Sequence, residues 1–181
     1  PLYLEWNIWR SMVMINYAKK VQGNFTLDLD GIPLNQALGN MADIEVEYEG
    51  FKMILEVTMS SGNKQYEMEG EPVARHFGNL QRSSTVPVYC LFVAPKISEG
   101  ALAHFFNLNR MNTKAYGGKT RIVPMNLSQF MSFITIAKDK KFDNSKVLES
   151  YLDTVIQQNL VLDDESIWYQ HINDSIPAWV S

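Results

Sequence analysis

Hydrophobic and polar residues alternate with a period of two in the stretch that follows Ala42, where Ile44, Val46 and Tyr48 are separated by acidic residues. This alternation predicts a β-strand with one apolar face. Glu49-Gly50 fits a two-residue turn, and an apolar-rich run from 51 to 59 follows it at once. The pattern therefore predicts a β-hairpin near the centre of the first half of the chain.

The turn sets the register of this hairpin, and one face is then apolar throughout: Tyr48 opposite Phe51, Val46 opposite Met53, and Ile44 opposite Leu55. On the other face, Asp43 is opposite Glu56. Opposed residues lie about 4.5–5.5 Å apart at Cβ, and like charges there destabilise a sheet unless a proton or a cation intervenes. A hard cation with oxygen ligands, such as Mg²⁺, would resolve the conflict. A solvated acidic face in a slightly different register is the alternative, and the hairpin alone does not decide between them.

The other periodicities predict helices and two further strands. The predicted helices span 2–20, 64–82 with a break or kink at Gly70 and Pro72, 98–108, 126–140, 147–160 and 167–180. The run 86–94 is nearly all apolar, which is typical of a strand buried on both faces of a mixed or parallel sheet. A shorter strand is predicted at 121–125, and 23–41 is predicted to be irregular. The order of elements indicates the α/β class.

The first predicted helix has an apolar stripe, which consists of Leu2, Trp6, Trp9, Met12, Val13 and Tyr17. Glu5 lies at the edge of this stripe. From the pattern alone, Glu5 is interpreted as a first-turn charge that favours the helix dipole. In the helix after the hairpin, Gln65 and Glu69 are four residues apart and share a face. His76, further along, is interpreted as a surface or supporting residue.

Composition and charge restrict the class of protein. A chain of 181 residues with 46% hydrophobic and 20% charged residues is typical of one soluble domain, here 1–181. We expect no membrane span, because no apolar run approaches about 20 residues. Cys90 is the single cysteine, so a disulfide framework is excluded and a cytoplasmic location is expected. The net charge of −4 argues against a globally basic nucleic-acid surface, but a nuclease that concentrates acids at a metal site remains compatible.

A leading helix, a hairpin with one acid on each strand, a helix and a buried strand together resemble the PD-(D/E)xK nuclease fold. The local sequence is more specific. LEWNIWR at 4–10 and ADIEVEYEGFKMILEVTMSSGNKQYEMEGEPVARHF at 42–77 resemble the type IIS restriction endonucleases and nicking enzymes of the AlwI, MlyI, PleI and BstNBI group. The catalytic domains of that group are FokI-like. The resemblance extends to about residue 133 and implies a mixed central sheet flanked by helices, with extra helices at the C-terminal end.

The resemblance also implies a set of site residues. Four acids fall in family positions: Glu5, Asp43, Glu56 and Glu69. The implied cofactor is Mg²⁺, with Mn²⁺ as a substitute, held by Asp43, Glu56, the carbonyl of Val57 and Glu69. Gln65 would orient the site or contact DNA phosphate. Thr58 stands where the motif has lysine, which leaves open whether Lys64, a metal-bound water or Glu69 takes over its role.

The implied activity is hydrolysis of DNA phosphodiester bonds by a cleavage domain or subunit. We expect double-stranded DNA as substrate, and sequence recognition by another domain or by the large subunit of a heterodimer. Two cleavage domains are expected to pair transiently. Five basic residues are candidates for contact with the DNA backbone: Lys64, Lys114, Lys119, Arg110 and Arg121. Two alternatives remain open, namely a repair or mobile-element nuclease of the same fold, and a non-catalytic interaction module.

Overall fold

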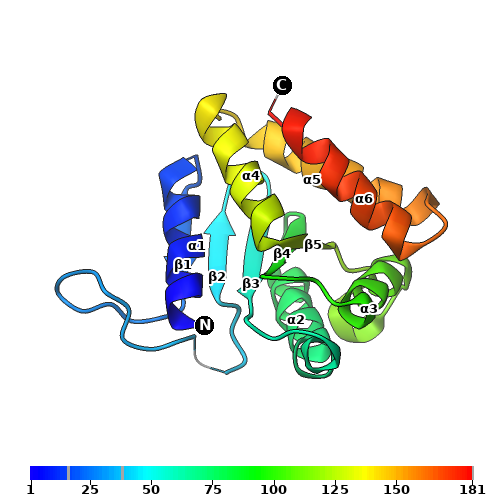
Figure 1. Ribbon diagram of the computed structural model, residues 1–181, viewed down its shortest axis with the longest axis horizontal. Helices are drawn as coiled ribbons and strands as arrows, with labels where there is room; N and C mark the ends of the chain where they lie inside the picture. The colour runs from blue at the N-terminus through cyan, green and yellow to red at the C-terminus, as the bar shows by residue number, and fades with distance from the viewer. Residues whose placement is uncertain (16, 38, 181) are drawn as a thin grey trace.

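A five-stranded mixed sheet forms the centre of the computed structural model, which describes residues 1–15, 17–37 and 39–180 (Figure 1). The strands lie in sequence order: β1 (Lys20–Gly23), β2 (Ile44–Glu47), β3 (Lys52–Val57), β4 (Val88–Ala94) and β5 (Ile122–Asn126). The pairs β1–β2 and β2–β3 are antiparallel, whereas the pairs β3–β4 and β4–β5 are parallel. The predicted α/β class and mixed sheet are confirmed.

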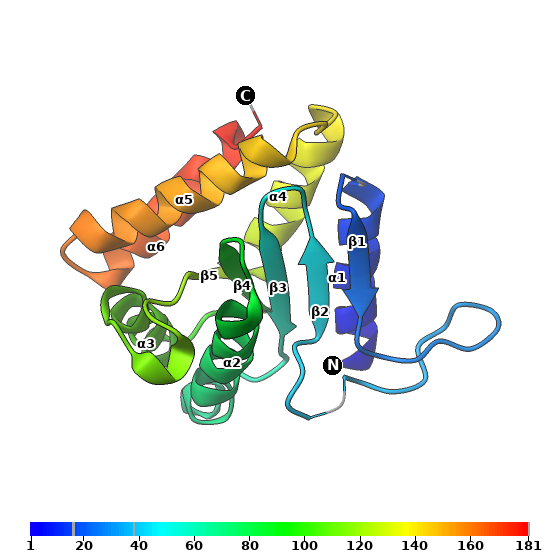
Figure 2. The same ribbon diagram turned by 180° about the vertical axis from the view of Figure 1, so that it is seen from behind.

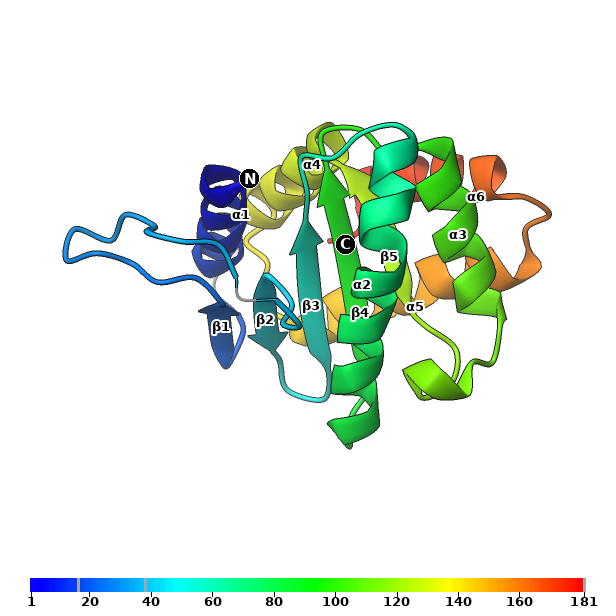
Figure 3. The same cartoon turned by 90° about the horizontal axis from the view of Figure 1, so that it is seen from below.

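Helices cover both faces of the sheet (Figures 1 and 3). Their bounds are α1 (Leu2–Ile15), α2 (Asn63–Ser83), α3 (Glu99–Arg110), α4 (Leu127–Asp139), α5 (Ser145–Val161) and α6 (Glu165–Ser175), with 3₁₀ turns η1 (Lys114–Tyr116) and η2 (Ile176–Ala178). One core contains residues of α1, α4, α5 and α6, and the other is dominated by α2 and α3. Among the described residues, no helix has the length and apolar character needed to cross a membrane.

The two-residue period of the strands explains the two cores. Met53 and Leu55 of β3 point into the core of α1 and α4, while Ile54 between them points into the core of α2. Every residue of β4 is buried, so the prediction of a strand covered on both faces is confirmed. The predicted hairpin register is also confirmed, since Ile44 pairs with Leu55 and Val46 pairs with Met53. Asp43, which precedes Ile44, therefore reaches the same edge of the sheet as Glu56.

The first predicted helix, 2–20, extends past the end of the observed helix, and the strand that follows was not predicted. Helix α1 ends at Ile15, and Lys20–Gly23 forms β1, which pairs with β2. Pairing with β1 satisfies the backbone groups of β2 that would otherwise form an open sheet edge. The buried face is also different from the predicted stripe: it consists of Glu5, Ile8, Met12 and Ile15. The tryptophans lie at its flanks, where Trp9 donates a hydrogen bond to the carbonyl of Val21.

Helix α2 is continuous through Gly70 and Pro72, so a break, one of the two possibilities that the sequence left open, does not occur. It is continuous because Val73, Ala74 and Phe77 are buried against the sheet, which compensates for the hydrogen bond that proline cannot donate. Gly70 serves close packing instead. A Cβ at this position would lie 3.1 Å from the imidazole ring of His104 on α3.

A long irregular segment separates β1 from β2, as predicted, and we call its described residues 24–37 and 39–41 the arm. The arm projects from the body of the molecule beside α1 (Figures 1 and 2). Its outer part is an ordered turn, because the carboxylate of Asp28 accepts hydrogen bonds from the backbone N–H groups of Asp30 and Ile32, at 2.9 and 2.8 Å. A bridge between Leu27 and Pro33 closes the turn.

Candidate functional site

Asp43 and Glu56 meet at one edge of the sheet, and both side chains are fixed by neighbours. Asp43 lies immediately before β2, and its Oδ2 accepts a hydrogen bond of 2.7 Å from the backbone N–H of Val57. Glu56 is buried on β3, and its Oε1 lies 2.9 Å from Nδ1 of His76 on α2. The hairpin thus supplies the backbone positions of both acids, and α2 supplies a partner for one of them.

Glu69 approaches the same edge from α2. Its Oε1 accepts hydrogen bonds from the hydroxyl groups of Thr58, at 2.6 Å, and Ser60, at 3.2 Å. Thr58 thus occupies the position of the motif lysine but holds a carboxylate in place instead of contributing a positive charge.

Glu5 reaches the site from α1, on the other face of the sheet. Its side chain is 2% exposed, and its Oε1 accepts a hydrogen bond of 2.8 Å from the amide of Gln36 in the arm. Its Oε2 is buried without a hydrogen-bond partner in the part of the chain that the structure describes. The interpretation of Glu5 as a first-turn surface charge is wrong, because the helix turns it inward.

The electrostatics of these side chains show that they form one cluster, which we call the acid cluster (Glu5, Asp43, Glu56 and Glu69). Burial, followed by the charge of Glu56, raises the pKa of Asp43 to about 8. Burial, followed by the charges of Glu69 and Glu5, raises the pKa of Glu56 well above its usual range. The positive charge of Arg75 partly opposes this increase in the pKa of Glu56. Without a cation, the site therefore retains protons that ordinary carboxyl groups release.

The donor set suits a hard divalent cation, because every side-chain donor in the acid cluster is a carboxylate oxygen. Among the described residues, no three His, Cys, Asp or Glu side chains are close enough to enclose a metal ion by themselves. This is compatible with Mg²⁺, which commonly binds one or two carboxylates and completes its shell with water and phosphate oxygens. The buried, unpartnered oxygen of Glu5 and the repulsion between Asp43 and Glu56 both fit such an ion.

Two residues that were predicted to belong to the site, Gln65 and Lys64, lie outside the acid cluster. Gln65 is fully buried, and its amide joins the carbonyl groups of Ser60 and Lys96 and the backbone N–H of Ser98. Gln65 therefore links the loop after β3 to the loop after β4, and it has no exposed surface for a DNA phosphate. Lys64 is exposed, and within the described residues no hydrogen bond or ion pair connects it to the acid cluster. Its role as a substitute for the motif lysine remains a prediction.

Three further residues take their roles through contacts that form only in three dimensions, and for His76 the supporting role, one of its two interpretations, is confirmed. Arg110 is not available for DNA, because its guanidinium donates hydrogen bonds to the carbonyls of Asn159 and Leu162. His76 is part of the site through Glu56, and Arg75 supplies the positive charge that acts on Glu56. The spacing of seven residues from Glu69 to His76 places both on one face of α2, which is the signal that could have identified His76.

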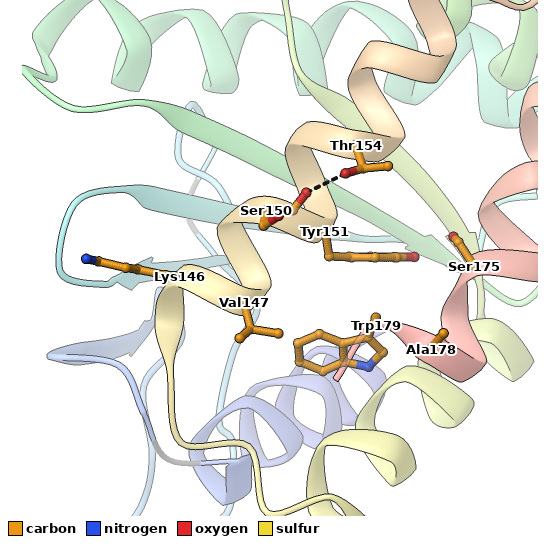
Figure 4. A pocket seen from close by; sticks show the side chains of 8 residues that line it. All are labelled: Lys146, Val147, Ser150, Tyr151, Thr154, Ser175, Ala178 and Trp179. Atoms are coloured by element: carbon orange, nitrogen blue, oxygen red, sulfur yellow. Dashed lines mark hydrogen bonds between the residues drawn. The ribbon is translucent and has the colours of Figure 1, made fainter. Parts of the chain in front are cut away.

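A cavity of about 440 Å³ lies away from the acid cluster, between α5 and the C-terminal turn η2 (Figure 4). Among the described residues, its lining includes Lys146, Tyr151 and Trp179 but no carboxylate or imidazole side chain. The acid cluster, and not this cavity, therefore has the chemistry of a metal centre.

A mixed sheet with an antiparallel hairpin, acids on both of its strands and a covering helix defines the restriction-endonuclease-like class of α/β proteins, the PD-(D/E)xK fold. The chain belongs to the AlwI restriction endonuclease family, whose model matches residues 1–133. The solved structure of the small subunit of the heterodimeric restriction endonuclease R.BspD6I is similar, with 27% sequence identity and a TM-score of 0.82. That similarity covers 97% of this chain and 90% of the small subunit. Curated proteins yield no significant match.

Proposed function

We propose that this chain is a Mg²⁺-dependent endonuclease that hydrolyses DNA phosphodiester bonds at the acid cluster. The observation that carries the proposal is the meeting of half-buried Asp43 and buried Glu56 at one edge of the sheet, where the charge of Glu56 makes Asp43 harder to ionise. Two opposed carboxylates destabilise the fold when nothing lies between them, and the arrangement becomes favourable when a cation binds between them. The membership of the AlwI family supports the assignment to nucleases.

Asp43 and Glu56 would hold Mg²⁺, with the carbonyl of Val57 as a further ligand and Glu69 binding the metal through its coordinated water, and Mn²⁺ would substitute. When bound, such an ion lowers the pKa of a coordinated water and stabilises negative charge on the scissile phosphate. The protein's own groups keep the acids in place. The backbone N–H of Val57 fixes Asp43, His76 fixes Glu56, and Thr58 fixes Glu69. Such supporting hydrogen bonds orient metal ligands and raise metal affinity.

We further propose that the chain is the cleavage subunit or domain of a type IIS enzyme, with a FokI-like role. A separate domain or large subunit would read the DNA sequence, and two cleavage domains would pair transiently to cut both strands. The similarity to the small subunit of a heterodimeric restriction endonuclease supports this division of labour. The exposed Lys114 and Lys119, together with Arg121, would contact the DNA backbone and would read no sequence.

The proposal is tested by tethering the chain to DNA. The full chain is fused to a zinc-finger array of known specificity and is incubated with a plasmid that carries the zinc-finger site, in Mg²⁺ or Mn²⁺. Tethering raises the effective DNA concentration at the acid cluster to about millimolar, so the missing recognition subunit no longer limits the reaction. We expect nicks or breaks near the site, and a loss of at least about 100-fold in rate for Asp43→Asn or Glu56→Gln.

The matched control is Glu47→Gln, an exposed acid on β2 that should leave the rate unchanged. If footprinting shows that the fusion occupies its site but DNA remains intact in both metals, the nuclease proposal is wrong. The non-catalytic interaction module would then be the better account of the fold.

A further inference from the structure

One polar contact joins the arm to the acid cluster. The amide of Gln36 donates a hydrogen bond of 2.8 Å to Oε1 of Glu5, from a position 31 residues along the chain. Nothing in the periodicity of either segment brings these residues together. The contact exists because the arm leaves β1, turns outward and returns past the N-terminal end of α1 before β2 begins (Figure 2).

Glu5 depends on this contact because its environment offers little else. The side chain is 2% exposed, and Gln36 is its one side-chain hydrogen-bond partner among the described residues. A buried carboxylate without a donor is strongly disfavoured. With one oxygen bound by Gln36, the other oxygen remains without a partner. The charge of Glu5 acts on both Asp43 and Glu56, which places its carboxylate at the acid cluster.

Hydrogen bonds anchor the arm next to Gln36 and at its base, which helps to hold this amide in place. On the outer side, the neighbouring Asn35 accepts a hydrogen bond of 3.1 Å from the backbone N–H of Thr26. At the base of the arm, the backbone N–H of Asn24 donates to the carbonyl of Asp43 at 2.9 Å. The side chain of Asn24 donates to the carbonyl of Ala42 at 2.6 Å. The segment that carries Gln36 is therefore anchored next to a proposed metal ligand.

We propose that Gln36 is a positioning residue of the metal centre: by binding one oxygen of Glu5, it holds the other oxygen ready for the divalent cation or for water bound to that cation. The inference rests on the proposed function, since it concerns the same metal. It adds a residue from the arm to a site otherwise built from α1, the hairpin and α2. Gln36 is exposed and belongs to neither hydrophobic core, so its replacement removes no core packing.

The test is a double-mutant cycle on Mn²⁺ binding, measured by calorimetry with the full chain and free Mn²⁺ as the probe. Gln36→Ala should weaken Mn²⁺ binding by about tenfold, which is the low end for loss of a supporting contact to a metal ligand. Gln36→Met, which keeps the length of the side chain but has no donor, should do the same. In a Glu5→Gln background, Gln36→Ala should change the affinity by less than about twofold, because Gln36 acts through Glu5.

Leu34→Ala is the matched control, an exposed residue of the same arm that should bind Mn²⁺ as the wild type does. The melting temperatures of all variants are measured in EDTA, and each variant should be fully folded at the temperature of the titration. An equal Mn²⁺ affinity of Gln36→Ala and the wild type would overturn the inference and leave the proposed function intact. So would an equal loss in the Glu5→Gln background, which would mean that Gln36 acts by another route. Absence of Mn²⁺ binding by the wild type would instead overturn both.

Discussion

At the scale of single residues, Asp43 and Glu56 are carboxyl groups that the fold keeps protonated at a pH where free carboxyl groups are ionised. The pKa of Asp43 is about 8 in the folded chain and 3.8 in its ordinary state. The folded protein therefore binds a proton that the unfolded chain has lost, and folding becomes less favourable as the pH rises from 3.8 to about 8. His76 and His104 have the opposite effect, so that folding becomes more favourable as the pH rises towards 6.5, because burial lowers the pKa of each from its ordinary value of 6.5.

Because the acids and the histidines change the free energy of unfolding in opposite directions, the effect of the acids is measured at a pH where the histidine effect is constant. Above the ordinary histidine pKa of 6.5, the contributions of the buried histidines are constant. Between pH 6.5 and 8, we expect the free energy of unfolding in EDTA to fall by about 2 kcal/mol, measured by urea denaturation. Mg²⁺ should restore stability at pH 8 by replacing the protons, and Asp43→Asn should show a shallower decline. A free energy of unfolding that is constant or rises across this window would contradict the raised pKa values.

Thr58 gives a second prediction at this scale, because its hydroxyl holds Glu69. Thr58→Val keeps the shape of the side chain but removes the donor, so Glu69 loses its shortest hydrogen bond. We expect a loss of about 1–2 kcal/mol in the free energy of unfolding and a loss of about tenfold or more in the DNA cleavage rate of the zinc-finger fusion.

Thr154→Val is the control for Thr58→Val. The hydroxyl of Thr154 donates to the carbonyl of Ser150 on the exposed side of α5, far from the acid cluster. Its removal should leave cleavage unchanged. Equal rates for Thr58→Val and the wild type would show that Glu69 does not need this support.

The sequence was sufficient to identify the acids but insufficient to identify their partners. The opposition of Asp43 and Glu56 follows from the two-residue period and one turn, both of which are local. The role of Glu5 required the family resemblance, since its position on the helix suggested an ordinary surface charge. The spacing from Glu69 places His76 on the same face of α2, but its contact with Glu56 across 20 residues depends on how α2 packs. Gln36 contacts Glu5 across 31 residues, which no local pattern encodes.

At the scale of elements, α2 is the part that closes the site, and its position depends on small residues. Gly78 lies against η1 so closely that a Cβ there would be 2.7 Å from the Cα of Tyr116. Because the neighbouring atom is backbone, α2 or η1 would have to shift. We therefore expect Gly78→Ala to lower the free energy of unfolding by about 1–3 kcal/mol, measured by urea denaturation.

The control for this prediction is a helical glycine with room around it. At Gly100, in the first turn of α3, the nearest atom to an added Cβ is 3.4 Å away, in the side chain of Tyr66. Gly100→Ala should be neutral or should stabilise the protein by up to about 1 kcal/mol, through the higher helix propensity of alanine. If both variants have the same stability, close packing of α2 on η1 does not limit the position of the helix.

Most elements were predictable because their hydrophobic periods are long and uninterrupted, as in the all-apolar β4 and the helices of the C-terminal region. The errors were at places where tertiary contacts override local preferences. The helical pattern predicted a helix up to residue 20 and no strand after it, but Lys20–Gly23 pairs with the exposed edge of β2 as β1. Gly70 and Pro72 predict a break or kink in α2, but burial of Phe77 and its neighbours keeps the helix continuous.

At the scale of the whole molecule, the helices on both faces of the sheet contribute side chains to one edge of the sheet. Helix α1 brings Glu5 from one face, α2 brings Glu69 and His76 from the other, and the hairpin brings Asp43 and Glu56 between them. The arm adds Gln36. Such convergence concentrates negative charge in a chain whose net charge is only −4. The central claim is that a divalent cation completes this arrangement.

A calorimetric titration of Mg²⁺ into the EDTA-stripped chain at pH 7.5 tests that claim most directly. We predict saturable binding at millimolar or lower concentration by the wild type and by Glu47→Gln, an acid on the exposed part of the same hairpin. Asp43→Asn and Glu56→Gln should each weaken binding by at least about tenfold, because each removes a ligand. No binding by the wild type, or equal binding by all four proteins, would contradict the metal centre and the nuclease mechanism built on it.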